Sequence, residues 1–162
     1  MSTTFVLYEE EFEGIKRLLN TLRMDASAKI VFLVDKNGQQ IAGAGEVDLV
    51  DSTSLASLTA GNVAATDGLA KLIGEKEFSI LFHEGRKDNI HISIVGQRLI
   101  LVVIFDERSS LGLVRLRVRK ASADIERVLT EMDSKAQEVG AVEAASPFAE
   151  ITDDDIDALF SE

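Results

Sequence analysis

The chain has 162 residues and a net charge of −11, and 46% of its residues are hydrophobic. This length suits one domain, with a core large enough to fold without disulfide or metal staples. The hydrophobic share is ordinary for a globular protein and excludes wholesale disorder, and the lack of cysteine excludes a disulfide framework and a thiolate metal site.

The negative charge is concentrated near the C-terminal end. Residues 138–162 contain eight acidic residues and no basic one, whereas residues 1–137 contain 20 acidic and 17 basic residues. The body is nearly neutral, which argues against nucleic acid as a partner, because phosphates need a basic face. The start lacks a basic segment followed by a long apolar run, and the longest apolar run, residues 99–105, is too short to span a bilayer. We expect a cytoplasmic protein without membrane insertion.

The first third of the chain predicts one helix and a pair of strands. Residues 8–26 place apolar side chains at helical spacing, with glutamates early and basic residues later, as suits the helix dipole. Residues 29–35, which are apolar from Ile30 to Val34, are typical of a buried strand. Asn37 and Gly38 then favour a tight hairpin turn, and the glycines of residues 40–45 indicate an edge strand or a bulge.

A central helix with two unlike faces is predicted over residues 52–73, after a cap at Asp51 or Ser52 and before Gly74. Large apolar side chains recur at roughly helical spacing on one face: Leu55, Leu58, Leu69, Leu72 and Ile73. A second stripe consists of small residues at intervals of four: Ala56, Ala60, Ala64 and Gly68.

This small-residue stripe has two interpretations. Gly61 and Gly68 each cost a helix interior about 1 kcal/mol relative to alanine, and the close approach of another backbone would offset that cost. The stripe either packs against the sheet of its own chain or faces a partner, which includes the same helix of a second subunit. We favour the partner and take the four stripe residues as a candidate binding site.

Three strands and a long helix are predicted after Gly74. Strand-like runs cover residues 78–83, 90–95 and 99–105, and the last is apolar throughout, so it should lie centrally. Residues 111–132 repeat apolar side chains at steps of three and four, which indicates a helix capped by Ser109 or Ser110. The order α-β-β-α-β-β-β-α predicts an α/β (α+β) fold, with a mixed, mostly antiparallel five-strand sheet and helices on both faces.

The composition changes after residue 137. Residues 138–150 consist mostly of glycine, alanine, valine, glutamate and serine, a composition that is typical of a linker. We therefore predict a folded domain over residues 1–137, a linker over 138–150 and an acidic helical tail over 151–162.

The tail has the pattern of a short helix that binds a partner. Thr152 stands three residues before Asp155, as in a capping box, and three acidic residues crowd the first turn. Ile156, Leu159 and Phe160 form one apolar edge. A helix of this length is marginal by itself in water, so we expect it to fold on a partner. A frayed terminus, or a tail docked on its own domain, is the alternative.

The motifs of common enzyme classes do not occur in the sequence. There is no phosphate loop, no dinucleotide fingerprint that opens a helix, and no Gly-X-Ser-X-Gly motif. The acids from Asp153 to Asp157 lack the glycine and terminal glutamate of a calcium loop. His83 and His91 fall on strands without a second ligand at metal spacing, which favours structural roles. We predict no catalytic, cofactor or metal site, and no enzyme activity of the chain's own.

Seven long stretches, together with the order of the elements, carry a family resemblance that covers nearly the whole chain. They are residues 8–12, 31–38, 53–65, 68–75, 101–106, 110–117 and 146–151. They resemble the Roadblock family of small dimeric platforms for Ras-like GTPases. The similarity is greatest to members that form homodimers and act as GTPase-activating proteins for a polarity GTPase of the MglA type, one GTPase per dimer. The resemblance implies the Roadblock fold, control of cell polarity and gliding motility, and concentration at a cell pole.

The resemblance also implies roles for the candidate residues. Ala64 and Gly68 match the family's GTPase-facing stripe, and the family's tail is implicated in a second contact with the GTPase that promotes nucleotide exchange. The chain has no arginine between Val47 and Glu84, so this helix cannot insert the arginine that many activators use. A smooth surface that reshapes the partner's switch loops fits the sequence better. The resemblance implies that the GTPase uses its own arginine and glutamine, repositioned by the dimer.

Two other functions stay open. Many Roadblock proteins are scaffolds that hold GTPases or motor subunits without accelerating hydrolysis, and other polarity proteins would then be possible partners. Mixed sheets with flanking helices also often enclose small molecules, but fold alone does not establish function. A ligand-sensing module would need a polar group set in an apolar pocket, and the sequence alone identifies none.

Overall fold

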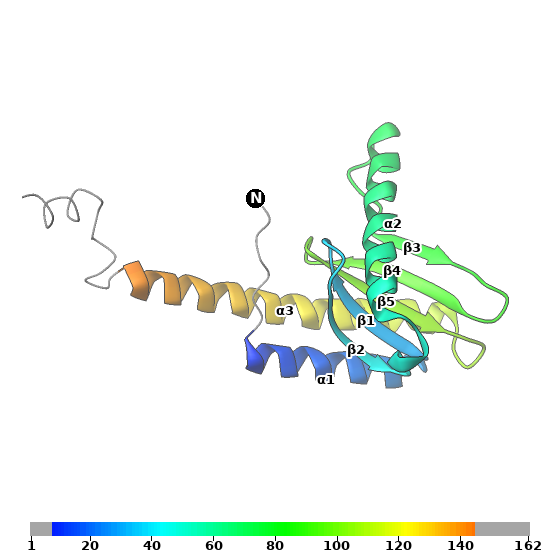
Figure 1. Cartoon of the computed structure of the whole chain (residues 1–162), viewed down its shortest axis with the longest axis horizontal. Coiled ribbons are helices and arrows are strands. Elements are labelled where there is room, and N and C mark those ends of the chain that lie inside the picture. The colour runs from blue at the N-terminus through cyan, green and yellow to red at the C-terminus, as the bar shows by residue number, and fades with distance from the viewer. Residues whose placement is uncertain (1–7, 145–162) are drawn as a thin grey trace, which may run out of the picture. The chain divides into compact units, whose positions relative to one another are not determined.

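The computed structural model describes residues 8–144, and the side chains of residues 8–138. In chain order the elements are α1 (Glu9–Asp25), β1 (Ile30–Asp35), β2 (Gln40–Gly45), a 3-10 turn η1 (Val47–Leu49), α2 (Ser52–Leu72), β3 (Ile80–His83), β4 (Asn89–Val95), β5 (Leu99–Phe105) and α3 (Leu111–Ala144) (Figure 1). The strands form one sheet in the order β2-β1-β5-β4-β3, and each neighbouring pair is antiparallel. The predicted element order and fold class are confirmed, with a fully antiparallel sheet.

The chain forms two compact units, Met1–Val128 and Leu129–Glu162, so α3 contributes to both. The sheet and its flanking helices belong to the first unit. β1 and β5 lie at the centre of the sheet because their residues are apolar on both faces. Every residue of β5 is buried, as is every residue of β1 except the last.

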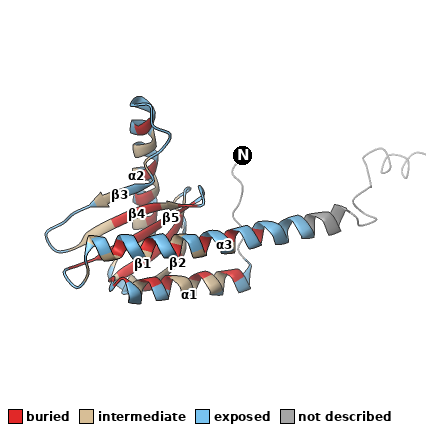
Figure 2. Cartoon of the chain, turned by 180° about the vertical axis from the view of Figure 1, so that it is seen from behind, coloured by how far each residue is buried: buried red, intermediate tan, exposed pale blue. Residues whose placement is uncertain are grey.

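Successive side chains of a strand point to opposite faces of the sheet, so the core of the first unit has two layers. α2 covers one face of the sheet (Figure 1), and α1 and the first part of α3 cover the other (Figure 2). The layer under α2 joins Ala56 and Val63 to Ile30, Phe32, Val34, Ile92, Ile100, Val102 and Ile104. The intervening residues, such as Val31 and Val103, are buried on the opposite face. The prediction of helices on both faces is therefore confirmed.

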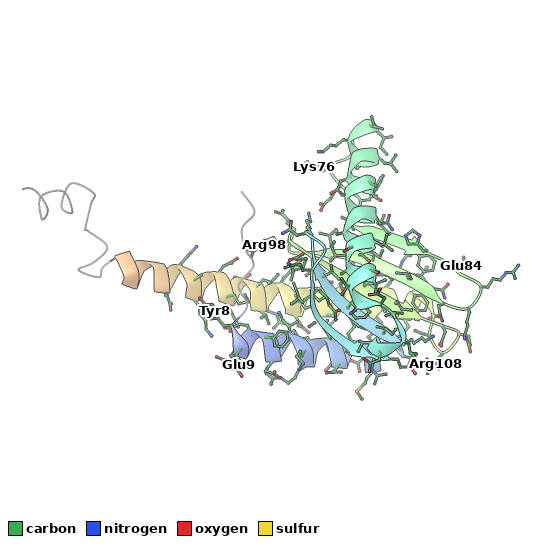
Figure 3. All side chains as sticks on the ribbon, viewed as in Figure 1. Tyr8, Glu9, Lys76, Glu84, Arg98 and Arg108 are labelled. Carbon is green, nitrogen blue, oxygen red and sulfur yellow. The ribbon has the colours of Figure 1, made fainter. Side chains whose placement is uncertain are left out.

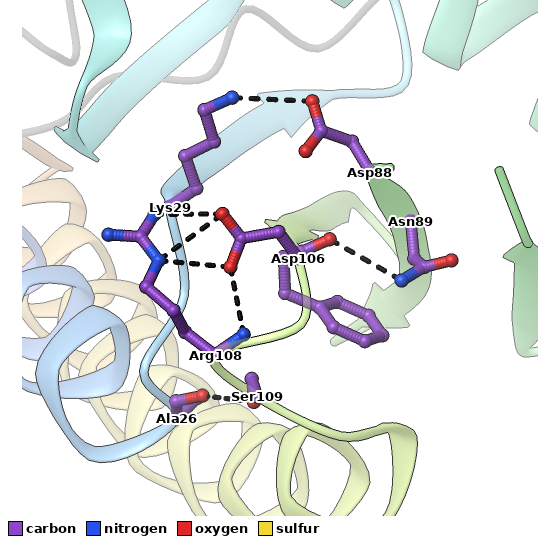
Figure 4. Close-up of polar contacts among 8 residues, drawn as sticks. Ala26, Lys29, Asp88, Asn89, Asp106, Arg108 and Ser109 are labelled. Carbon is purple, nitrogen blue, oxygen red and sulfur yellow. Dashed lines mark hydrogen bonds and ion pairs between the residues drawn. The ribbon is translucent and has the colours of Figure 1, made fainter. Parts of the chain in front are cut away.

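Polar contacts hold the start of α3 against the end of α1 (Figure 4). The carboxylate of Asp106, just after β5, accepts hydrogen bonds from the Arg108 backbone N–H (3.0 Å) and from its guanidinium (2.9 Å). The side-chain bond to Arg108, followed by the backbone bond, holds the pKa of Asp106 below its usual value. The Ser109 hydroxyl donates to the carbonyl of Ala26. Ser110, one of the two predicted caps, accepts from the backbone N–H three residues on (3.2 Å).

α3 is longer than the sequence predicted. It continues to Ala144, so residues 138–144 of the predicted linker are helical. Alanine and glutamate make up most of this stretch, and both are good helix formers; composition alone had suggested a linker. Residues 145–150 and the predicted tail, residues 151–162, lie outside the described residues.

Candidate partner-binding surface

α2 begins at a side-chain cap. Asp51, one of the two predicted caps, accepts hydrogen bonds from the Ser54 backbone N–H (3.2 Å) and from the Ser54 hydroxyl (2.7 Å). The hydroxyl bond first, and then the backbone bond, hold the pKa of Asp51 below its usual value. The cap fixes where the helix begins.

The inner side of α2 is built from small and medium residues. Those that are buried are Ala56, Thr59, Val63 and Ala70. The β1–β2 turn also approaches the helix closely: Gly38 has a φ of +93°, and a Cβ there would lie 3.3 Å from the Cα of Ser57. Part of the small-residue pattern therefore serves the chain's own core.

The four predicted binding residues of α2 do not share one exposed face. Ala56 is 1% exposed and belongs to the core, so the prediction that it faces a partner is wrong. Ala60 is partly buried against the same core, whereas Ala64 and Gly68 are exposed. A helix turns about 100° per residue, so each step of four residues advances about 40° around its axis. Over three such steps the stripe turns from the core to solvent.

Large apolar side chains lie beside the exposed part of the stripe. Leu58 and Leu72 are 73% and 84% exposed, and Leu69 and Ile73 are also exposed. Of the predicted apolar face, Leu55 packs against the core. The sequence predicts that these residues share one side of the helix, but not that this side is exposed. Both faces of α2 carry small or apolar residues, so the pattern does not show which face packs against the sheet.

The outer face of α2 is defined here as Leu58, Gly61, Ala64, Ala65, Gly68, Leu69 and Leu72, all of which are exposed. A Cβ added at Gly61 or Gly68 would meet no atom within 4 Å, so no neighbour in the described chain requires glycine at either position. The C-terminal part of α2 projects beyond the sheet (Figure 1), and Lys76 lies beside its end (Figure 3). Contiguous exposed apolar residues of this kind mark interaction sites.

β3 provides an open sheet edge next to the outer face. Among the described strands it pairs with β4 alone, and Ile80 on it is 49% exposed. The Asn62 amide of α2 donates to Nε2 of His83 on β3 (3.0 Å), which ties the helix to this strand. The opposite edge strand, β2, lies against α1. An unpaired edge is a template for pairing with another chain.

The remaining predicted site residues, Ile156, Leu159 and Phe160 of the tail, lie outside the described residues. Within residues 8–144, no cluster of three or more His, Cys, Asp or Glu side chains could hold a metal ion. No helix in the described part of the chain is long and apolar enough to cross a bilayer. His91 on β4 is buried, and neither ring nitrogen has a hydrogen-bond partner among the described residues.

Comparison with known proteins identifies relatives that share this fold. The family profile for the Roadblock/LC7 domain matches residues 15–105. The structure of Myxococcus xanthus MglB is 60% identical, with a TM-score of 0.74, over 78% of this chain and 96% of that chain. The gliding protein MglB of Thermus thermophilus is 31% identical, with a TM-score of 0.73, over 81% of this chain and 99% of that chain.

A third solved structure, described as MglB with a tetrameric arrangement, is 30% identical, with a TM-score of 0.74, over 81% of this chain and 98% of that chain. The search of curated proteins gave no match. The profile match spans β1 to β5 together with α2, so both the outer face and the open edge lie within the family domain. The chain therefore belongs to the Roadblock/LC7 family, among the MglB-type gliding-motility proteins.

Proposed function

We propose that the chain is a homodimeric GTPase-activating protein for a Ras-like polarity GTPase of the MglA type, one GTPase per dimer. The observation that carries the proposal is the outer face of α2, which is exposed, apolar and free of long side chains apart from its leucines. Such a face allows close contact with the backbone of a partner's loops. The 60% identity to Myxococcus xanthus MglB supports the same assignment.

The dimer would form through the β3 edge. Pairing of β3 with its copy would satisfy the open backbone edge and bring the two α2 helices, each tied to its β3 by the Asn62–His83 bond, onto one continuous platform. The exposed Leu58 on α2 would then be covered by the second copy or by the GTPase.

The activation would need no arginine from this chain. Residues 47–84, which include all of α2 and β3, contain no arginine. Instead, the outer face would contact the GTPase switch loops and reposition two residues of the GTPase itself. Its arginine would stabilise the charge of the transition state, and its glutamine would orient the attacking water. On this proposal Ala60, Ala64 and Gly68 are the contact residues from the predicted stripe, and Ala56 supports them from the core.

The acidic tail would supply a second contact. Ile156, Leu159 and Phe160 are its proposed anchors, and folding of this segment on the GTPase, away from the nucleotide pocket, would promote nucleotide exchange. The protein would act in the cytoplasm, concentrated at a cell pole, to control polarity and motility.

Single-turnover GTP hydrolysis by the cognate GTPase, with and without this chain, tests the proposal. Acceleration that saturates at two chains per GTPase is the expected result. Binding of the GTP-loaded GTPase without acceleration would instead identify a Roadblock scaffold that holds the GTPase or other polarity proteins. Light scattering on the same sample tests the dimer, and a monomer at micromolar concentration would contradict the platform.

A further inference from the structure

α3 crosses the strands on the face of the sheet opposite α2 (Figure 2). Residues of β3, β4 and α3 line a pocket there. Its volume is about 350 Å³, which falls within the range of small-ligand sites. β4 contributes His91 and Ser93, and α3 contributes Arg115 and Arg119. All of these residues belong to the first unit of the chain.

The floor of this pocket is polar, although the rest of the same sheet layer is apolar. His91 and Ser93 pair across the sheet with Val103 and Leu101 of β5, both fully buried. His91 is 1% exposed and Ser93 is 5% exposed. Neither nitrogen of the His91 ring, nor the Ser93 hydroxyl, has a hydrogen-bond partner among the described residues.

Unpaired polar atoms at such a depth destabilise a fold. A buried donor or acceptor left without a partner loses its hydration without compensation, and most buried polar side chains in proteins are hydrogen-bonded. A valine or alanine at either position would match the neighbouring strands and avoid this cost. Burial, and then the charge of Arg115, lower the pKa of His91. The ring is therefore neutral near pH 7, with one nitrogen a donor and the other an acceptor.

The rim of the pocket is positively charged. Arg115 and Arg119 stand four residues apart, about one turn of α3, and both are exposed. Guanidinium groups bind the oxygens of phosphates and carboxylates in a bidentate manner. Ile80 and Val118 add apolar surface to the walls. The arrangement combines two cations at the entrance, apolar walls and a neutral polar floor.

We propose that this pocket binds a small organic anion. Arg115 and Arg119 hold its phosphate or carboxylate group, Ile80 and Val118 contact its apolar body, and His91 and Ser93 bond a polar atom at its inner end. The site lies on the opposite face of the sheet from α2, so it is separate from the proposed GTPase surface and stands whether or not that proposal holds. Pairing of two β3 edges would use the backbone of that strand and leave the floor and the two arginines to one chain.

Calorimetry and amide NMR of the full chain, in a buffer without phosphate or carboxylate, test the site with four probes: phenyl phosphate, benzoate, inorganic phosphate and neutral phenol. We expect saturable binding of phenyl phosphate or benzoate, with shifts at the amides of β4 and of the first part of α3. The tighter of the two identifies the anionic group. Inorganic phosphate should bind more weakly because it leaves the apolar walls uncovered, and phenol should bind weakly because it leaves the arginines unused.

The decisive variant is Arg115→Gln with Arg119→Gln, because both side chains are exposed and their removal leaves the core intact. It should weaken binding of the tighter anion by at least about tenfold, because hydrogen bonds from a charged donor are stronger than neutral ones and the variant removes both guanidinium groups. Arg86→Gln with Lys87→Gln makes the same charge change in the exposed β3–β4 turn and should alter affinity by less than about twofold. Ser93→Ala should weaken binding without unfolding the chain.

Four results would overturn the proposal. The first is that neither anion saturates a site, which would leave the floor atoms to ordered water. The second is that phenol binds as tightly as the anions. The third is that the double arginine variant keeps the affinity of the unmodified chain. The fourth is that the control variant in the β3–β4 turn loses as much affinity as the arginine variant.

Discussion

The side-chain amide of Asn62 on α2 donates a hydrogen bond to Nε2 of His83 on β3, with 3.0 Å between the two nitrogens. The helix carries the proposed GTPase-binding face, and the strand carries the proposed dimer edge. Between them the chain runs through residues 73–79, almost all of which are exposed. This bond is therefore a direct link between the two surfaces.

The Asn62–His83 bond should contribute measurable coupling. In a double-mutant cycle with Asn62→Ala and His83→Ala, we expect a coupling energy of about 0.5–1.5 kcal/mol, the usual net contribution of one hydrogen bond. Urea unfolding at one fixed protomer concentration is the measurement, because dimerisation makes stability depend on concentration. Strictly additive effects of the two substitutions would show that the bond does not position β3.

Ala64→Arg with Gly68→Arg should abolish binding to the GTP-loaded partner and leave the fold intact. Both residues are exposed, and a Cβ at Gly68 meets no atom within 4 Å, so the long side chains clash only with a docked partner. The matched control is Gly112→Arg with Leu116→Arg, two exposed positions with the same spacing on α3. Pull-down and circular dichroism of both variants give the answer. Retained binding by the Ala64/Gly68 variant would show that the outer face of α2 is not the GTPase-binding surface.

Ala56 and Ala64 should differ in their response to the same substitution. Ala56→Leu places extra volume in the packed layer between α2 and the sheet, and we expect a loss of about 1–3 kcal/mol of unfolding free energy. Ala64→Leu adds the same atoms to an exposed position and should change stability by less than about 0.5 kcal/mol. Thermal or urea unfolding of both variants compares them directly. Equal losses would mean that the helix is rotated from the position described here.

The stability of the first unit should fall as the pH drops below about 6.5. His91 has a lowered pKa in the folded chain, through burial and then the charge of Arg115, whereas its pKa in the unfolded chain is about 6.5. Its contribution is thus complete above pH 6.5 and is lost as the pH falls from there through the folded-state pKa.

Urea unfolding between pH 8 and pH 5, in buffers without phosphate or carboxylate, measures this loss. His91→Gln should flatten the pH dependence, because it removes the buried group whose pKa is lowered in the folded chain. An unchanged pH profile in the His91 variant would assign the titration to other groups.

Deletion of residues 147–162 should leave dimerisation and accelerated hydrolysis in place but weaken partner affinity and exchange. Ile156, Leu159 and Phe160 each contribute about 1.5–3 kcal/mol when buried, less the cost of ordering the segment. Their joint replacement by alanine should therefore reproduce the deletion, whereas neutralising Asp153 to Asp155 should mainly change salt dependence and association rate. Calorimetry on the intact, deleted and substituted chains is the test, and equal affinities would exclude the tail as a second contact.

The sequence by itself determined the elements and the family. Local patterns identify strands such as β5, which is apolar throughout, and helices such as α3, whose apolar residues recur at steps of three and four, because each pattern reflects the geometry of its own element. The long matching stretches resemble the Roadblock family, and the profile match to residues 15–105 confirms the membership. The end of α3 was missed because alanine and glutamate occur in linkers as well as in helices.

Only the tertiary structure decided which side of α2 faces the sheet and which residues meet in the pocket. In α2 both faces are small or apolar, so the pattern is compatible with either orientation, and the packing of Ala56 and Val63 against β1 and β5 selects one. His91 and Arg115 lie far apart in the chain and share no motif spacing. They come together because His91 lies on the face of the sheet that α3 crosses. Such a contact depends on how the elements pack against one another, which local sequence patterns do not specify.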